Sequence, residues 1–282
     1  MATLSSNPEP LSRAVTSGAA RTKAVFFDID GTLVPFRAKG IPEGTRAALA
    51  ALRAGGVRTF IATGRHLSWT GNVADTPFDG YVTVNGGMCV AGDRKTVLYC
   101  RPIPADDMQR LEAFIERTKT PFVVVPADGD IFITGINPLV EEAAALLNIT
   151  AIPVRPIAEA RGKEVVQLMG FFTPDEQERS GVFGDALRGC EPTRWCPLFT
   201  DIIPCGGSKA AGIDRMIAHF GISLSETMAF GDGDNDVAML RHTAVGVAMG
   251  NASAAVKAAA DYVTLPADED GVGEALRRFA LI

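Results

Sequence analysis

The feature that most constrains the fold is the stretch KAVFFDIDGTL, residues 23–33, in which four apolar residues end on two aspartates one residue apart. Four consecutive apolar residues bounded by polar ones are typical of a buried strand in a parallel sheet. Ligands of such sheets bind beyond the carboxyl ends of the strands, which is where Asp28 and Asp30 fall. Asp30-Gly31 is also an ordinary turn sequence, but turn chemistry does not explain Asp28. Because two carboxylates in such a place repel each other unless a cation neutralises them, we expect a metal or catalytic site.

Two later stretches also place polar groups at points where a ligand is expected. Residues 23–62 follow a strand–helix–strand pattern, and such parallel crossovers are right-handed, so Thr63 falls at the same sheet edge as Asp28. A threonine there can cap a helix, but beside two carboxylates we expect its hydroxyl to donate to a phosphate oxygen. Lys209 lies in the first turn of a helical pattern over 208–220, where the helix dipole is already positive, and this favours a bound anion.

The order of these groups along the chain is characteristic. Asp-x-Asp, then Thr63, then Lys209, then Gly-Asp-x-x-Asn-Asp at residues 231–236 resembles the haloacid dehalogenase (HAD) superfamily of phosphohydrolases. The last motif with Met239 three residues beyond it, and the length of chain between Thr63 and Lys209, are similar to the Cof-type branch with a C2B cap. The motifs are highly specific together, although each alone is weak.

We therefore predict an α/β fold, a doubly wound and mostly parallel sheet in a Rossmann-like HAD core, with an inserted α+β cap domain. The expected parts are a disordered leader over residues 1–22, the core over 23–86 and 204–282, and a C2B-type cap over 87–203. In the cap we expect an antiparallel sheet that includes short strands over 88–90 and 97–99, a hairpin turn over 128–130, and helices over 105–118 and 174–187. In the core we expect a helix over 251–260.

The resemblance implies a role for each motif residue. Asp28 would be the nucleophile, and Asp30 the acid and base. The metal would be Mg²⁺, held by Asp28, Asp232 and the backbone carbonyl of Asp30. The resemblance also implies phosphate binding by Thr63, Gly64, Lys209 and Asn235, and support of the metal's waters and of Lys209 by Asp236. It implies that Asn85 lies near the substrate. Arg65, in the loop after Thr63, and Asp201 are further substrate candidates.

The expected function is a Mg²⁺-dependent phosphatase that hydrolyses small phosphorylated metabolites, by default sugar phosphates, through an aspartyl-phosphate. A phosphotransferase or phosphomutase that passes the same phosphoryl group to an alcohol is the alternative, which only product analysis separates. A receiver-type signalling domain is less consistent with Asp-x-Asp on the first strand and with the large insertion. A non-catalytic binding protein is not favoured either, because every motif position carries the expected residue type.

The composition of the chain excludes several classes of binding partner. A net charge of −6 argues against nucleic acid or an anionic membrane as partner, and no apolar run approaches the ~20 residues that span a bilayer. The five cysteines form no close pair, which predicts free thiols in a reducing, cytoplasmic compartment. The expected partner is a small phosphate ester, and the sequence leaves a monomer or a homodimer open.

Overall fold

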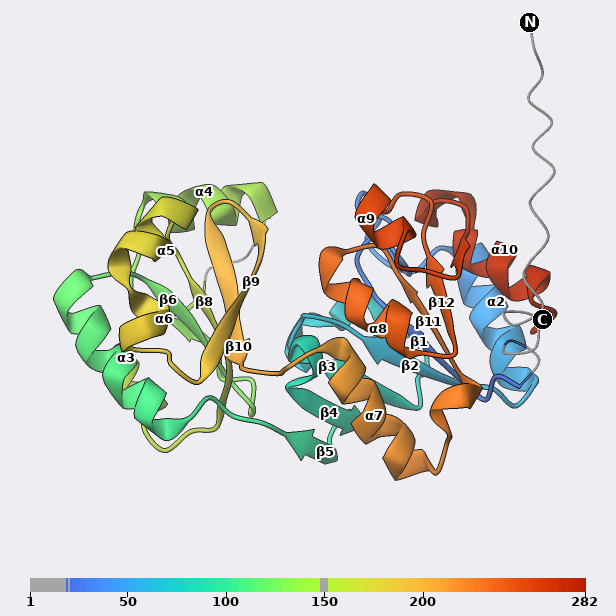
Figure 1. The fold of residues 1–282 in the computed structure, drawn as a ribbon, viewed down its shortest axis with the longest axis horizontal. Helices are drawn as coiled ribbons and strands as arrows, with labels where there is room; N and C mark the ends of the chain where they lie inside the picture. The colour runs from blue at the N-terminus through green and yellow to red at the C-terminus, as the bar shows by residue number, and fades with distance from the viewer. Residues whose placement is uncertain (1–18, 20, 148–151) are drawn as a thin grey trace, which may run out of the picture. The chain divides into compact units, whose positions relative to one another are not determined.

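The computed structural model describes residues 19, 21–147 and 152–282 (Figure 1). The predicted leader over residues 1–22 lies outside the described residues except at positions 19, 21 and 22. The chain divides into two compact units, one made of Met1–Thr59 with Gly221–Ile282 and the other of Phe60–Phe220.

Two sheets carry the fold. The larger has eight strands in the order β13-β12-β11-β1-β2-β3-β4-β5, and the smaller has five in the order β7-β6-β8-β10-β9. In the first unit the larger sheet contributes β1 (Ala24–Phe27), β11 (Thr227–Gly231), β12 (Val245–Ala248) and β13 (Tyr262–Val263). These four strands run parallel, and every residue of β1, β11 and β12 is buried. The all-apolar stretch before Asp28 is therefore the buried parallel strand that its composition predicts.

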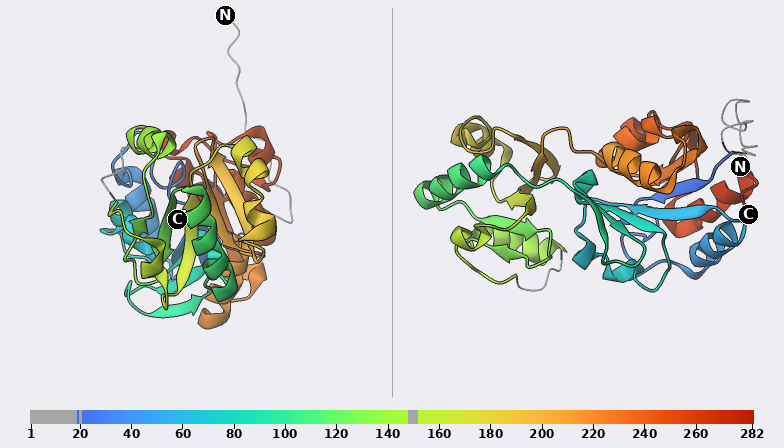
Figure 2. Two further views of the ribbon diagram at one scale, coloured as in Figure 1. Left: turned by 90° about the vertical axis from the view of Figure 1, so that its left-hand side faces the viewer. Right: turned by 90° about the horizontal axis from the view of Figure 1, so that it is seen from below.

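Helices lie on both faces of this part of the sheet (Figure 2). The helices of the first unit are α2 (Glu43–Ala54), α8 (Val237–His242), α9 (Ala254–Lys257) and α10 (Gly271–Arg278), with 3₁₀ turns η5 (Leu224–Glu226), η6 (Asp234–Asp236) and η7 (Ala267–Glu269). Helix α2 packs against α10, whereas α8 packs against β11 and β12. Helix α2 buries Thr45, Ala48, Leu49 and Leu52, which recur at helical spacing and face the core.

In the second unit the larger sheet continues through β2 (Arg58–Ala62), β3 (Gly80–Thr83), β4 (Met88–Ala91) and β5 (Val97–Cys100). The 3₁₀ turns of this part are η1 (Leu67–Trp69), η2 (Gly71–Val73) and η3 (Val84–Gly86). Helix α7 (Lys209–Phe220) packs on β3, β4 and β5. Strand β2 begins at Arg58, at the end of the first unit, and runs parallel to β3. Strands β4 and β5 pair antiparallel, and they extend this sheet rather than the smaller one in which we expected them. The reason is local: Asn85 and Gly86 have φ of 50° and 87°, and this left-handed turn reverses the chain directly onto β3.

The smaller sheet lies wholly in the second unit and is antiparallel. It consists of β6 (Phe122–Pro126), β7 (Phe132–Ile133), β8 (Val165–Gly170), β9 (Cys190–Cys196) and β10 (Phe199–Pro204), with α3 (Ala105–Thr118), α4 (Pro138–Leu147), η4 (Ile157–Ala160), α5 (Pro174–Ser180) and α6 (Val182–Asp185) beside it. Leu111 and Phe114 of α3 pack with Phe122 and Leu168 of the sheet in one apolar core. The predicted turn over 128–130 is confirmed, because β6 and β7 pair antiparallel across it.

The predicted fold class, a doubly wound α/β core with an α+β domain, is confirmed. The exact domain boundaries, 23–86 with 204–282 and 87–203, stay a prediction. All five cysteines are free, as expected. Among the helices of the described residues, none has the length and apolar content needed to cross a bilayer.

Candidate active site

The site begins where two neighbouring parallel strands end. Strand β1 pairs with β11 so that Phe27 lies opposite Phe230, and the backbone N–H of Asp28 donates to the carbonyl of Phe230 at 3.0 Å. Asp28 follows β1 directly and Asp232 follows β11 directly. Because the register is fixed by the strands, the two aspartates emerge side by side at the carboxyl edge of the sheet.

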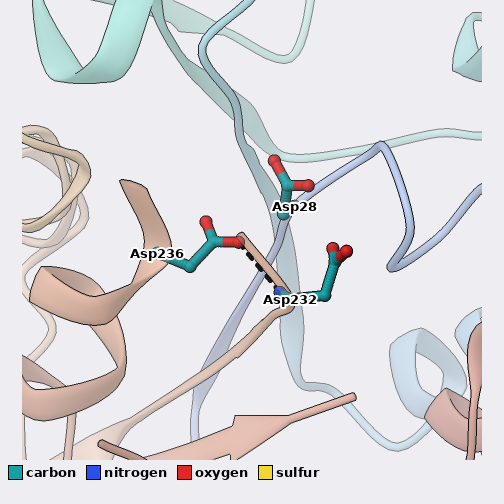
Figure 3. Close-up of side chains that lie close together, drawn as sticks. All are labelled: Asp28, Asp232 and Asp236. Carbon is teal, nitrogen blue, oxygen red and sulfur yellow. Dashed lines mark hydrogen bonds between the residues drawn. The ribbon is translucent and has the colours of Figure 1, made fainter. Parts of the chain in front are cut away.

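Asp236 joins these two aspartates to form a cluster of three carboxylates (Figure 3). One carboxylate oxygen from each residue lies within 4.8 Å of the other two. The three residues are largely buried, with exposed fractions of 7% for Asp28, 8% for Asp232 and 0% for Asp236. Three buried carboxylates at this distance repel one another strongly unless a cation neutralises them, and oxygen donors are what Mg²⁺ prefers. The donor set of this cluster therefore fits a hard divalent cation.

Gly31 makes room for this cluster. Its φ is +78°, and a Cβ atom added there would lie 2.1 Å from Oδ2 of Asp232. The loop is held in place by two hydrogen bonds, from the N–H of Gly31 to the carbonyl of Val34 and from the N–H of Val34 to the carbonyl of Ile29, both 2.8 Å. Only glycine meets both demands of this position, the left-handed backbone and the missing side chain.

The carboxylate of Asp236 fixes the loop that carries Asp232. Its Oδ2 accepts a hydrogen bond from the backbone N–H of Asp232 at 2.9 Å (Figure 3). The same oxygen accepts from the N–H of Gly233, also at 2.9 Å. The loop approaches so closely that a Cβ at Gly231 would lie 2.5 Å from Cγ of Asp236. One oxygen of Asp236 is therefore already occupied by two hydrogen bonds from this loop.

Two residues to which the sequence assigned no role contact Asp232. The hydroxyl of Thr32 donates to Oδ1 of Asp232 at 2.8 Å, and the amide of Asn251 donates to Oδ2 at 3.2 Å. Thr32 stands directly beside the Asp-x-Asp motif, so adjacency was the signal that could have identified it. Asn251 gave no such signal, because we expected it inside a helix that in fact begins at Ala254.

Asp30 and Asn235 occupy loops of the same unit. Asp30 is half-buried and forms an isolated bridge with Val34, two residues beyond Asp28. Asn235 is half-buried in η6. A Cβ atom added at Gly233 would lie 2.7 Å from Oδ1 of Asn235, so this side chain lies close to the backbone of Gly233.

The second unit brings three other predicted residues together. Thr63, 1% exposed, follows β2, and its Oγ1 accepts from the N–H of Arg65 at 3.2 Å. The carbonyl of Thr63 accepts from the N–H of Asn85 at 3.1 Å, and the Arg65 guanidinium donates to the carbonyl of Trp69 at 2.9 Å. Gly64 lies between Thr63 and Arg65 in the same turn.

The backbone just before Lys209 lies against the turn that follows Asn85. A Cβ at Gly86, which follows Asn85, would lie 2.0 Å from the carbonyl oxygen of Ser208, so the turn packs tightly against the start of α7. Lys209 itself is fully buried in the first turn of that helix. Asp201, 7% exposed, lies on β10 opposite Met169 of β8.

His66 is a further buried titratable group beside Arg65. Its exposed fraction is 3%, and Nδ1 accepts from the N–H of Ser68 at 3.2 Å. Burial lowers the pKa of His66 below its usual 6.5, and the backbone of Ala127 and the charge of Asp128 oppose this only in part. The imidazole is therefore held in its neutral form.

Comparison with known proteins identifies the family. The model of the haloacid dehalogenase-like hydrolase family matches residues 25–276. The chain belongs to this family. The match includes every motif residue from Asp28 to Asp236. It confirms the resemblance drawn from Asp28, Lys209 and the motif over 231–236.

Individual relatives agree with this assignment. The sugar phosphatase BT4131, described as HAD subclass IIB, is 43% identical, with a TM-score of 0.81 over 93% of this chain and 100% of its own. BT1666 from Bacteroides thetaiotaomicron, a HAD phosphatase, is 33% identical, with a TM-score of 0.85 over 99% and 100% of the two chains. YkrA of Bacillus subtilis, whose name marks it as an inferred phosphatase, is 36% identical over 93% of this chain and 99% of its own length. This HAD protein is thus a Cof-type phosphoric monoester hydrolase, as predicted.

Proposed function

We propose that this HAD phosphatase hydrolyses small phosphorylated metabolites, with sugar phosphates as the substrate class, in a Mg²⁺-dependent reaction through an aspartyl-phosphate on Asp28. The observation that carries the proposal is the buried cluster of Asp28, Asp232 and Asp236 at the carboxyl edge of the sheet. A cluster of this kind combines a nucleophile and cation ligands in one place.

Asp28, Asp232 and the backbone carbonyl of Asp30 would hold Mg²⁺, with Asp236 in support. When bound, the cation would neutralise the carboxylates and the charge of the phosphate, so that one anion can approach another. The buried oxygen donors support this assignment. The cysteines lie outside this cluster, so the donor set contains oxygen alone.

The chemistry follows in two displacements. A carboxylate oxygen of Asp28 attacks phosphorus, the bond from phosphorus to the ester oxygen breaks, and Asp30 gives its proton to the departing alcohol. Asp30 then takes a proton from water, the water oxygen attacks phosphorus, and inorganic phosphate leaves as the Asp28 carboxylate is restored. The position of Asp30 in the loop two residues beyond Asp28 supports this division of roles.

Four residues would bind the transferring phosphoryl group in our proposal, namely Thr63, Gly64, Lys209 and Asn235. Charge spreads over the equatorial oxygens in phosphoryl transfer, so fixed donors stabilise it. The hydrogen bonds that join Thr63 to Asn85 and Arg65 support a common site for the phosphate and the rest of the substrate, with Asn85 and Arg65 toward the latter.

The substrate class rests on similarity. The sugar phosphatase BT4131 is 43% identical to this chain, over 93% of the chain's length. A substrate of this class has an alcohol leaving group with several hydroxyls, which suits recognition by polar side chains such as Asp201.

The proposal is tested by phosphate release from a panel of sugar phosphates and other phosphorylated metabolites, with Mg²⁺ or with EDTA, beside an Asp28→Asn variant. We expect release from hexose and pentose phosphates with Mg²⁺ only, and none from the variant. Release in EDTA would contradict the metal assignment. Transfer of the phosphoryl group to an added alcohol in place of hydrolysis would indicate a phosphotransferase.

A further inference from the structure

The side chain of Asn251 joins three segments of the first unit. Its Nδ2 donates to the carbonyl of Gly31 at 2.9 Å and to Oδ2 of Asp232 at 3.2 Å, and its Oδ1 accepts from the N–H of Ala267 at 2.9 Å. Asn251 lies at the surface, but both polar atoms of its amide are used by these partners. It thereby ties the loop after β1 and the loop after β11 to the turn that begins η7.

The partners determine which way the amide points. Gly31 and Asp232 offer only acceptor oxygens, and Ala267 offers only a donor N–H. A flipped amide would place oxygen against two oxygens and nitrogen against an N–H group, and all three hydrogen bonds would be lost. The NH₂ group of Asn251 therefore faces the carboxylate.

Thr32 holds the other oxygen of the same carboxylate. Its hydroxyl, on a residue that is 1% exposed, donates to Oδ1 of Asp232 at 2.8 Å. Both oxygens of Asp232 thus accept a hydrogen bond, and the backbone N–H of Asp232 donates to Asp236. A carboxylate held in this way has little freedom to turn.

We propose that Thr32 and Asn251 are positioning residues that hold the carboxylate of Asp232 in the orientation a divalent cation needs. The inference rests on the proposed cation site but not on the proposed substrate. Hydrogen bonds to a ligating carboxylate orient it, and loss of such a partner typically weakens metal binding about 10- to 100-fold. Asn251 has a second effect, because its bond to Gly31 holds the loop that continues from Asp28.

The test measures Mg²⁺ binding by calorimetry on the full chain after removal of metal with EDTA, together with thermal unfolding with and without Mg²⁺. For Asn251→Ala and for Thr32→Val, which is nearly isosteric, we expect the Mg²⁺ dissociation constant to rise at least about tenfold. Thr32→Ser keeps the hydroxyl and should bind like the wild type. Because both residues act on one carboxylate, the double variant should lose less than the product of the single effects.

Ser253→Ala is the matched control. Ser253 caps α9 two residues beyond Asn251 and accepts from the N–H of Val256, so its loss should lower the melting temperature and leave Mg²⁺ affinity unchanged. The inference is overturned if both single variants bind Mg²⁺ as tightly as the wild type, or if the wild type binds none. Tight Mg²⁺ binding without phosphate release would contradict the proposed phosphatase chemistry and leave the positioning role intact.

Discussion

Oδ2 of Asp236 accepts a hydrogen bond from the backbone N–H of Asp232 at 2.9 Å, and both side chains are buried. The same oxygen accepts from the N–H of Gly233. One carboxylate thus satisfies two donors of the loop that carries Asp232. This relationship makes Asp236 a structural support of the cluster as well as one of its charges.

Replacement of Asp236 by alanine should therefore destabilise the protein. The loss would leave one buried and one partly buried N–H group without their charged acceptor, and we expect the free energy of unfolding to fall by about 2–3 kcal/mol. Asp236→Asn keeps an oxygen that accepts both bonds, so it should cost about 1 kcal/mol. Urea unfolding of the two variants and the wild type measures the difference. Equal stability of the two variants would contradict the role of the shared acceptor.

Gly31→Ala tests whether the cluster needs the space that glycine leaves. The variant would suffer left-handed strain of about 1–2 kcal/mol and a clash with Oδ2 of Asp232. Gly56→Ala is the matched control, since Gly56 has a similar φ of +84° but nothing within 4 Å of the added Cβ. We expect both variants to lose stability in urea unfolding, but only Gly31→Ala to lose Mg²⁺ binding and activity. Retention of Mg²⁺ affinity in Gly31→Ala would contradict the close packing at Asp232.

The neutral His66 predicts a pH dependence of stability. Its pKa is lowered by burial in the folded state, so below pH ~6.5 the unfolded chain takes up a proton that the folded chain does not. The free energy of unfolding should then fall as the pH drops through this range. In thermal unfolding between about pH 8 and about pH 5.5 we expect His66→Asn to lose less stability than the wild type.

His219 is the control for this experiment, because it is exposed on α7. His219→Asn should show the same pH dependence as the wild type. If His66→Asn also follows the wild type, then burial of His66 does not govern the acid sensitivity of the fold.

Elements whose signals are local could be predicted from the sequence. The helix over 105–118 is observed as Ala105–Thr118, because its apolar residues recur at helical spacing between two clear boundaries. The strand before Asp28 and the turn over 128–130 were also predicted correctly. In each case the residues that decide the structure are close neighbours in the chain.

Boundaries that depend on a single cap or turn were predicted less well. The helix expected over 251–260 is only Ala254–Lys257, because Ser253 caps it and leaves Asn251 free to bind elsewhere. The helix expected over 174–187 is broken at Gly181, where φ is +65°. The spacing of apolar residues does not indicate where a cap or a left-handed glycine ends a helix.

The part of the site that the sequence did not predict is non-local. Asp28 and Asp232 could be placed at the sheet edge because each directly ends a strand. Thr32 bonds to Asp232, which lies 200 residues further along the chain, and Asn251 bonds to both loops. A contact between two loops has no periodic pattern, so it becomes visible only when the fold brings the loops together.

Trapping of the phosphorylated enzyme tests directly whether Asp28 is the nucleophile. In Asp30→Asn both the acid for the leaving alcohol and the base for water are lost, so the aspartyl-phosphate should accumulate when the leaving group needs no proton. We would mix this variant with p-nitrophenyl phosphate and Mg²⁺, quench with acid and determine the intact mass and the modified peptide. If Asp28 is the nucleophile, we expect one phosphoryl group on the peptide that contains Asp28, and none in Asp28→Asn. Phosphate release by the wild type with the phosphoryl group on another residue, or a phosphorylated Asp28→Asn protein, would contradict this assignment.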